Sequence, residues 1–272
     1  MTLNRTNSVL LAIILIGIFI WLEILLFLIH EVFNYHLLKS VFNFSIPLIS
    51  YESKVYPIVS IGMYSLIIYS SAMIVWRISL QCMESIQWRN FLRTEKHDRL
   101  SNQLMNEYAH LKTPIIVIRN DHRLALTYGF LRPKIIISTG IIHKLNENEL
   151  KAIMLHQYTH CKSYNPLRSL IAWIIKESMP FMPIQRGLFH YLRIWMILQA
   201  DRYVITKLTS SEYSNKSILL TCEGPPQSDA YRIQQIIQQE LHVRVPLWSV
   251  GSLLTSFIML LSISIFIVSI GY

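Results

Sequence analysis

Charged residues are scarce in this chain of 272 residues, and the scarcity is concentrated in three stretches. Asp, Glu, Lys and Arg make up 15% of the sequence, whereas a soluble domain has about 25%. Residues 8–29 contain one charge, Glu23, and residues 56–76 and 246–272 contain none. Each stretch reaches the roughly 20 apolar residues that cross a bilayer as a helix. The sequence therefore predicts a membrane protein with three transmembrane helices, at about 8–29, 56–78 and 246–272.

Cysteine is scarce as well. The three cysteines, Cys82, Cys161 and Cys222, are odd in number and lack C-x-x-C spacing. Free thiols in a reducing compartment fit that pattern. The sequence also contains no internal repeat and no low-complexity tract.

Runs of Lys and Arg are missing, although the net charge is +9. A charge of that size would suit a nucleic-acid-binding protein. Neither a basic run nor a recognised binding motif accompanies it, so we expect no nucleic-acid partner. The sequence does not define an oligomeric state.

The basic residues that are present lie mostly in the middle of the chain. Of the 25 Lys and Arg residues, 22 lie between Arg77 and Arg244, whereas residues 30–55 contain only Lys39 and Lys54. The positive-inside rule places the middle portion in the cytosol and the 30–55 loop outside. We therefore expect a multi-pass protein of the cell (plasma) membrane.

The predicted spans define three segments of the chain. Residues 1–81 hold two transmembrane helices and a short outer loop, residues 82–245 form a cytosolic domain, and residues 246–272 form the third transmembrane helix. A signal peptide is the alternative for the first span. Its apolar run exceeds the roughly 7–15 residues of an h-region, and no small-residue cleavage site follows, so we interpret it as a retained anchor.

The cytosolic segment combines short strands with helices. Three β-like runs, Ile115–Arg119, Ala125–Phe130 and Lys134–Thr139, are separated by turn signals and predict a small antiparallel sheet. A helix then begins at Asn146, where Glu149 completes a capping-box pattern, and continues through His160. The fold class is therefore α+β.

One motif on this helix has the residue types of a metal site. His156 and His160 are four residues apart, so both imidazoles lie on one helix face and can converge on one metal ion. Zincins carry Glu after the first histidine, as the general base of hydrolysis. Here that position holds Gln157, which has the same shape and no usable basicity. Alone the pattern is weak, because two helical histidines often mean only a polar helix face.

The flanking residues carry a resemblance. The stretch from Leu126 to Leu167, LTYGFLRPKIIISTGIIHKLNENELKAIMLHQYTHCKSYNPL, is followed further on by Ala200-Asp201-Arg202. It resembles the BlaR/MecR-type antibiotic-sensor metallopeptidases and the related HtpX and CAAX-processing peptidases, over roughly residues 110–240. The matching motifs are P-x-I-x-x-S-x-G-I and L-x-x-x-E-L, followed by the helix that carries the two histidines. The resemblance implies a cytosolic zincin-like (gluzincin) metallopeptidase domain with zinc as cofactor and a peptide or protein as substrate.

Three positions depart from the family pattern. Gln157 replaces the general base, and Ile197 stands four residues before Asp201, where the resemblance implies a glutamate as third zinc ligand. Asn165 stands where family members often have Asp. Glu177 is the nearest candidate for a substitute ligand, and its alternative is a solvated helix residue. For Asp201 the resemblance implies a carboxylate that accepts a hydrogen bond from the other ring nitrogen of a ligating histidine, and the alternative is a cap or ion pair beside Arg202.

Two functions remain open from the sequence. One is a membrane-embedded zinc endopeptidase in processing or signalling, catalytically impaired because Gln157 and Ile197 replace carboxylates. The other is a pseudopeptidase that binds a peptide or partner protein and regulates without cleavage. In either case the sheet edge beside the zinc helix, formed by Lys134–Thr139 or its neighbour, would take an extended peptide.

Overall fold

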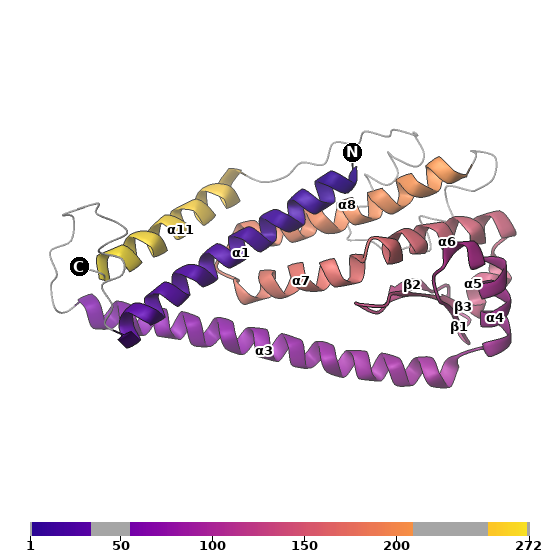
Figure 1. Ribbon diagram of the computed structural model, residues 1–272, viewed down its shortest axis with the longest axis horizontal. Coiled ribbons are helices and arrows are strands. Elements are labelled where there is room, and N and C mark those ends of the chain that lie inside the picture. The colour runs from indigo at the N-terminus through magenta and orange to yellow at the C-terminus, as the bar shows by residue number, and fades with distance from the viewer. Residues whose placement is uncertain (1, 34–54, 209–249, 271–272) are drawn as a thin grey trace. The chain divides into compact units, whose positions relative to one another are not determined.

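The computed structural model describes residues 2–33, 55–208 and 250–270 (Figure 1). The chain divides into two compact units. The first, here called the sheet unit, comprises Met1–Leu10, Leu80–Ala172 and Phe189–Leu247. The second, here called the apolar unit, comprises Leu11–Ser79, Trp173–Leu188 and Trp248–Tyr272.

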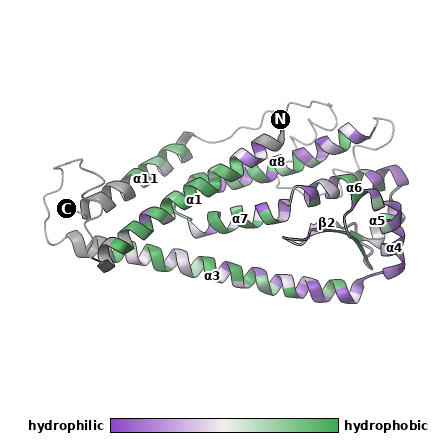
Figure 2. Ribbon diagram, viewed as in Figure 1, coloured by the Kyte–Doolittle hydropathy of each residue, from purple (hydrophilic) through white to green (hydrophobic). Residues whose placement is uncertain are grey.

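Three apolar helices supply most of the apolar unit: α1 (Thr2–Phe33), the first part of α3 (Val55–Glu95) and α11 (Val250–Ile270). Within the described residues, α1 and α3 are long and apolar enough to cross a membrane, and α11 contributes only a shorter apolar segment, Gly251–Ser262. Figure 2 shows hydrophobic residues along most of α1 and a change toward hydrophilic residues along α3. Two of the three predicted spans are thus supported by length and composition, and the third stays a prediction.

The two long helices expose large apolar side chains. On α1, Leu11 is 57% exposed and Ile18 is 58% exposed, and on α3 Ile68 is 68% exposed. Neighbouring residues on α1 face inward, because Ile20 and Ile24 pack with Met179 and others in one cluster. Exposed apolar surface of this extent is unfavourable in water and is what a lipid-facing helix presents.

The sheet unit contains a mixed sheet of three strands, β1 (Ile115–Ile118), β2 (Ala125–Tyr128) and β3 (Lys134–Ser138). Their order is β1-β3-β2, with β1 parallel and β2 antiparallel to β3. The prediction of an antiparallel sheet is therefore wrong for one pair. The reason is that the chain leaves β1 for the opposite edge before the β2–β3 hairpin turns it back, so β3 runs in the direction of β1.

Directly after β3 the backbone packs closely against the segment that follows β1. Helix α5 (Thr139–Lys144), which the sequence did not predict, begins after Ser138, whose side chain accepts a hydrogen bond from the Ile141 N–H. The N–H of Gly140 donates to the Asn120 carbonyl at 2.8 Å. A Cβ at position 140 would collide with the Asp121 carbonyl, so the contact requires glycine there.

Helix α6 (Glu147–Lys162) begins where the sequence predicted. The Asn146 side chain accepts from the Glu149 N–H, and the Glu149 side chain accepts from the Asn146 N–H, so the capping box is confirmed. The buried face of the helix packs on the sheet, with Ile153 of α6 and Ile135 of β3 in one core. The remaining elements are α4 (Asp98–Glu107), the 3-10 helix Ala109–Leu111, α7 (Asn165–Ser178) and α8 (Pro183–Lys207).

Candidate active site

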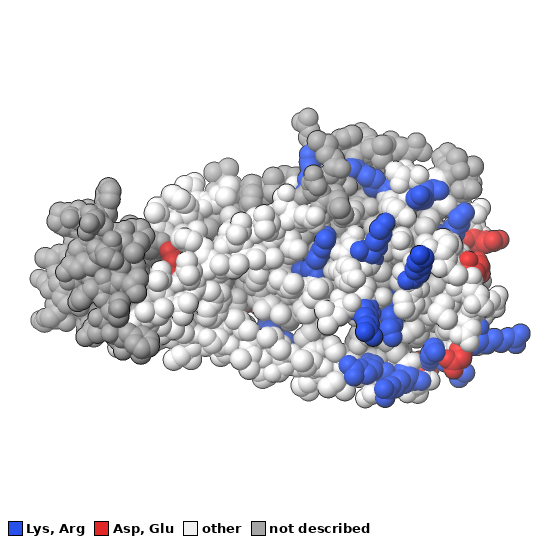
Figure 3. Space-filling view, viewed as in Figure 1, with Lys and Arg blue, Asp and Glu red and all other residues white. Residues whose placement is uncertain are grey.

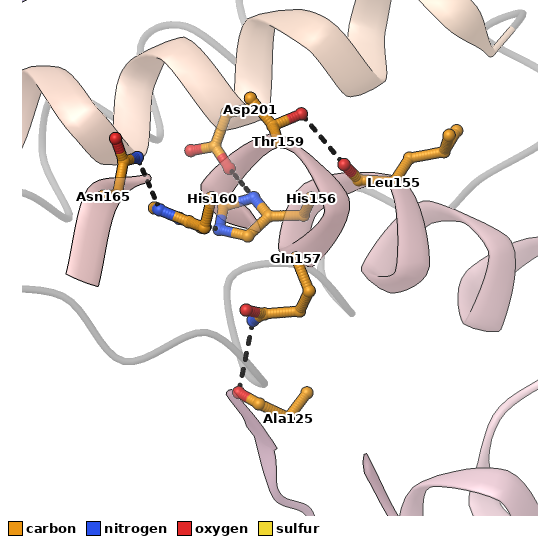
Figure 4. Close-up of polar contacts among 8 residues, drawn as sticks. All are labelled: Ala125, Leu155, His156, Gln157, Thr159, His160, Asn165 and Asp201. Atoms are coloured by element: carbon orange, nitrogen blue, oxygen red, sulfur yellow. Dashed lines mark hydrogen bonds and ion pairs between the residues drawn. The ribbon is translucent and has the colours of Figure 1, made fainter. Parts of the chain in front are cut away.

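His156 and His160 lie on one face of α6 and point toward each other (Figure 4). Their Nε2 atoms are 3.2 Å apart. Tetrahedral zinc with Zn–N bonds of about 2.0–2.1 Å holds two nitrogens about 3.3 Å apart. The predicted convergence of the two rings is thus present, with a spacing that fits two nitrogen ligands of one zinc ion.

Each ring has a second polar neighbour. Asp201 on α8 is fully buried, and its Oδ1 lies 2.8 Å from Nδ1 of His156. Nδ2 of Asn165 lies 2.8 Å from Nδ1 of His160. The Asp201 contact is the arrangement in which a carboxylate fixes the tautomer of a ligating histidine. Asp201 therefore lies where its carboxylate could orient the His156 ring, and its role toward a metal stays a prediction.

These contacts also form an uninterrupted polar chain from Asp201 through His156 and His160 to Asn165 (Figure 4). Each neutral imidazole donates with one nitrogen and accepts with the other. With protons on Nδ1 of His156 and Nε2 of His160, every link in the chain pairs a donor with an acceptor. Both rings are then satisfied by protein groups alone.

Gln157 is buried and joins α6 to β2. Its Nε2 donates to the Ala125 carbonyl at 3.2 Å, and its Oε1 accepts from the Thr127 hydroxyl at 2.9 Å. Figure 4 shows the side chain directed at Ala125. An ionised glutamate has no proton to donate to a carbonyl. The amide at the general-base position is therefore used as a structural link to the strand.

A cavity of about 260 Å³ opens beside this link and is lined by both histidines, Gln157, Ile197 and residues of β2. Ile197, where the resemblance implies the third ligand, thus lines the same cavity as the histidines, and its side chain offers no donor atom. Arg193, one helical turn before Ile197, lines the same cavity and belongs to none of the motifs in the sequence. Its i, i−4 relation to Ile197 is the signal that identifies it.

Glu177 has other partners. Its carboxylate contacts Arg77 at 2.9 Å and Lys176 at 2.6 Å, and it is not among the residues that line the histidine cavity. The hydrogen bond from Lys176, reinforced by Arg77, holds the pKa of Glu177 below its ordinary value. The partners observed for Glu177 are thus basic side chains, and its use as a substitute ligand stays a prediction.

The residues present do not complete a catalytic zinc site. Such a site has three protein ligands and one open position, and within the described part of the chain no group of three His, Cys, Asp or Glu side chains could hold a metal. The histidine pair fits zinc in spacing, but Ile197 supplies no third ligand. No hydrolytic step through a metal follows from this donor set.

A comparison with protein families agrees with the scaffold. A model of peptidase family M48 matches residues 92–204, which contain the sheet, α6 and most of α8. No curated protein matches the chain. The matched segment is therefore similar to the M48 metallopeptidases, which are HtpX- and CAAX-protease-like and generally zinc-dependent. The BlaR/MecR part of the resemblance stays a prediction.

Proposed function

We propose that this chain is a membrane-anchored pseudopeptidase, in which an M48-like domain binds an extended peptide or protein segment and does not hydrolyse it. The observation that carries the proposal is the hydrogen bond from the Gln157 amide to the Ala125 carbonyl at 3.2 Å. It gives the residue at the general-base position a structural task that a carboxylate cannot perform.

Two losses argue against hydrolysis. Removal of a positioned general base costs about 10²–10⁴-fold in rate, and Gln157 has no basicity to replace it. Ile197 removes the third protein ligand that a catalytic zinc needs. Because the two losses affect different parts of the machinery, together they leave peptide cleavage without either a base or a complete metal site.

The β2 edge of the sheet supports the proposal that the domain binds a peptide. Among the described residues, strand β2 has only β3 as a neighbouring strand. The Ser138 N–H donates to the Leu124 carbonyl, and the alternation of an antiparallel pair then turns the main-chain groups of Ala125 and Thr127 away from β3. Of these groups, the Ala125 carbonyl already accepts from Gln157. An extended segment added to this edge would run beside the histidine cavity, which offers room for a side chain. Of the two strands that the sequence left open, we propose β2, because β3 is central in the sheet.

An impaired zinc endopeptidase is the second candidate. The 3.2 Å spacing of the histidine nitrogens and the Asp201 contact favour it, since both are features of a zinc-binding helix. In either case we propose a multi-pass protein of the cell membrane with the sheet unit in the cytosol, because the basic residues gather in that part of the chain.

The decisive experiment compares the full chain with revertants in a neutral detergent. An unbiased peptide mixture is incubated with each protein, with and without EDTA, and cleavage is read by mass spectrometry alongside zinc content. We expect no cleavage by the unaltered chain or by either single change, and zinc-dependent cleavage after Gln157→Glu and Ile197→Glu together. The matched control is Gln157→Glu with Ile197→Gln, which keeps the size of the second side chain without the charge. Chelator-sensitive cleavage by the unaltered chain would refute the pseudopeptidase and establish the second candidate.

A further inference from the structure

A second cavity, of about 530 Å³, lies in the sheet unit and shares no residue with the histidine cavity. Its walls come from the C-terminal end of α3, from α4, from β1 and from the β2–β3 hairpin. The volume is within the roughly 300–1,000 Å³ typical of ligand pockets. The cavity has no part in the peptide-binding function proposed above.

The mouth of this cavity is basic. Among its lining residues, which all belong to the described part of the chain, four are cations and none is acidic: Arg89, Arg93, Lys96 and Lys134. Arg89 and Arg93 lie one turn apart on one face of α3, and Lys96 follows directly after the end of the helix. Like charges at this spacing destabilise a helix, and an anion bound between them removes that repulsion. Figure 3 shows Lys and Arg side chains gathered over the part of the chain that carries the sheet and α4.

One of these cations has an acidic partner. Lys96 contacts Asp98 at 2.7 Å, and the Asp98 side chain is exposed and does not line the cavity. Even with this neighbour counted, the mouth keeps a net charge of about three positive units. Arg89 and Arg93 have no acidic partner among the described residues.

The floor of the cavity is apolar and firmly held. Leu92 and Ile115 are buried, and Met105 from α4 adds an apolar side chain. Leu92 packs in a cluster with residues of β1 and β3. The Tyr128 hydroxyl donates to the Ser85 carbonyl of α3 at 2.9 Å, which ties the helix to the hairpin. The walls are therefore preformed rather than dependent on a ligand.

We propose that this cavity binds a phosphate monoester that carries an apolar group, either as the headgroup of an anionic lipid or as a free phosphate ester. Guanidinium groups bind phosphate oxygens in bidentate fashion, and Lys96 and Lys134 add point charges. Four cations that converge on one cavity favour a compact, doubly charged group over carboxylates spread along an acidic peptide. The apolar floor accommodates the substituent. Basic side chains that follow a membrane helix closely are also where anionic lipid headgroups are recognised.

The test is calorimetric titration of the full chain in neutral detergent with three probes: inorganic phosphate, dihexanoyl phosphatidate and dihexanoyl phosphatidylcholine. The pocket variant is Arg93→Gln with Lys134→Gln. The matched control is Arg123→Gln with Lys151→Gln, an equal loss of charge at exposed positions outside the cavity. We expect saturable binding of phosphatidate and no saturable binding of the zwitterionic lipid. A loss of about fivefold in affinity per charge removed should appear in the pocket variant and not in the control.

Each result decides the proposal. Phosphate binding within tenfold of phosphatidate supports a free ester, and phosphatidate binding more than tenfold tighter supports a lipid, whose tail uses the apolar floor. Equal weakening in the pocket and control variants would overturn the proposal, because the attraction would then be general to a basic surface. A Glu-rich peptide that displaces phosphatidate at lower concentration than phosphate does would also overturn it. The singly substituted Arg93→Gln chain, checked by circular dichroism, guards against loss of fold in the double variant.

Discussion

The side-chain nitrogen of Asn165 lies 2.8 Å from Nδ1 of His160, at the point where α7 begins. An amide nitrogen donates, so the ring nitrogen that it faces accepts, and the ring proton is then on Nε2. That is the nitrogen 3.2 Å from Nε2 of His156. One uncharged amide outside the histidine pair thus favours a hydrogen bond between the rings over a metal between them.

Asn165→Asp should raise zinc affinity. A carboxylate at 165 accepts the proton of Nδ1 and leaves Nε2 free to ligate, an effect worth about 10–100-fold in affinity for carboxylate partners of zinc-bound histidines. Competition with a chromogenic chelator measures the change, with the exposed Asn148→Asp on α6 as control. If both variants bind zinc like the unaltered chain, the tautomer argument fails.

Gln157→Glu alone should destabilise the fold. The new carboxylate would face the Ala125 carbonyl without a proton to share, in a site that is 5% exposed. Loss of one buried hydrogen bond with an unsatisfied partner costs about 1–3 kcal/mol in free energy of unfolding. Denaturant unfolding in detergent measures it. The same substitution at the exposed Gln103 should change stability by less than about 0.5 kcal/mol, and an equal effect at both positions would show that the amide link is dispensable.

Asp201→Asn should also lower stability. The carboxylate is fully buried and contacts Nδ1 of His156 at 2.8 Å. A hydrogen bond to a charged group contributes about 1.5–3 kcal/mol, and the amide keeps the shape but loses the charge. Because the amide oxygen still accepts from Nδ1, the free energy of unfolding should fall by about 1–1.5 kcal/mol, the difference between a charged and a neutral hydrogen bond, whereas Asp121→Asn at an exposed position should have little effect. Unchanged stability at 201 would mean that the buried contact contributes nothing.

Cys161 should resist alkylation. Burial raises the pKa of its thiol to about 11, so the thiolate that reacts with iodoacetamide is rare at pH 8. In a Cys222→Ser chain, mass spectrometry should find modification at the exposed Cys82 and none at Cys161 before unfolding. Rapid modification of Cys161 in the folded chain would contradict its burial.

The same pKa shift predicts a loss of stability in alkali. The unfolded thiol ionises near 9 and the folded one near 11. Between these values the folded state binds more protons than the unfolded state, so stability falls as pH rises. The contribution of Cys161 is complete below pH 9 and decreases through about pH 11. A Cys161→Ala chain should lack this part of the pH dependence in denaturant unfolding.

Local signals predicted the helix that carries the site. The capping box at Asn146 and Glu149 and the four-residue spacing of the histidines depend on neighbours in the chain, and both were right. The direction of β1 was wrong, because pairing order in a sheet depends on where the chain goes between strands. The contact of Glu177 with Arg77 could not be predicted, because the two residues are 100 positions apart in the sequence. The link between Gln157 and Ala125 was missed for the same reason, as it joins groups 32 residues apart.

Gly140, which follows β3, limits how the sequence can vary in evolution. Position 140 has space for a hydrogen and nothing larger, whereas Gly62, Gly187 and Gly251 have no described atom within 4 Å of where a methyl would stand. A larger side chain is therefore tolerated at positions 62, 187 and 251, and it is selected against at position 140. In an alignment of homologous sequences that keep this hairpin and helix, position 140 should always be glycine. Positions 62, 187 and 251 should also contain alanine and serine.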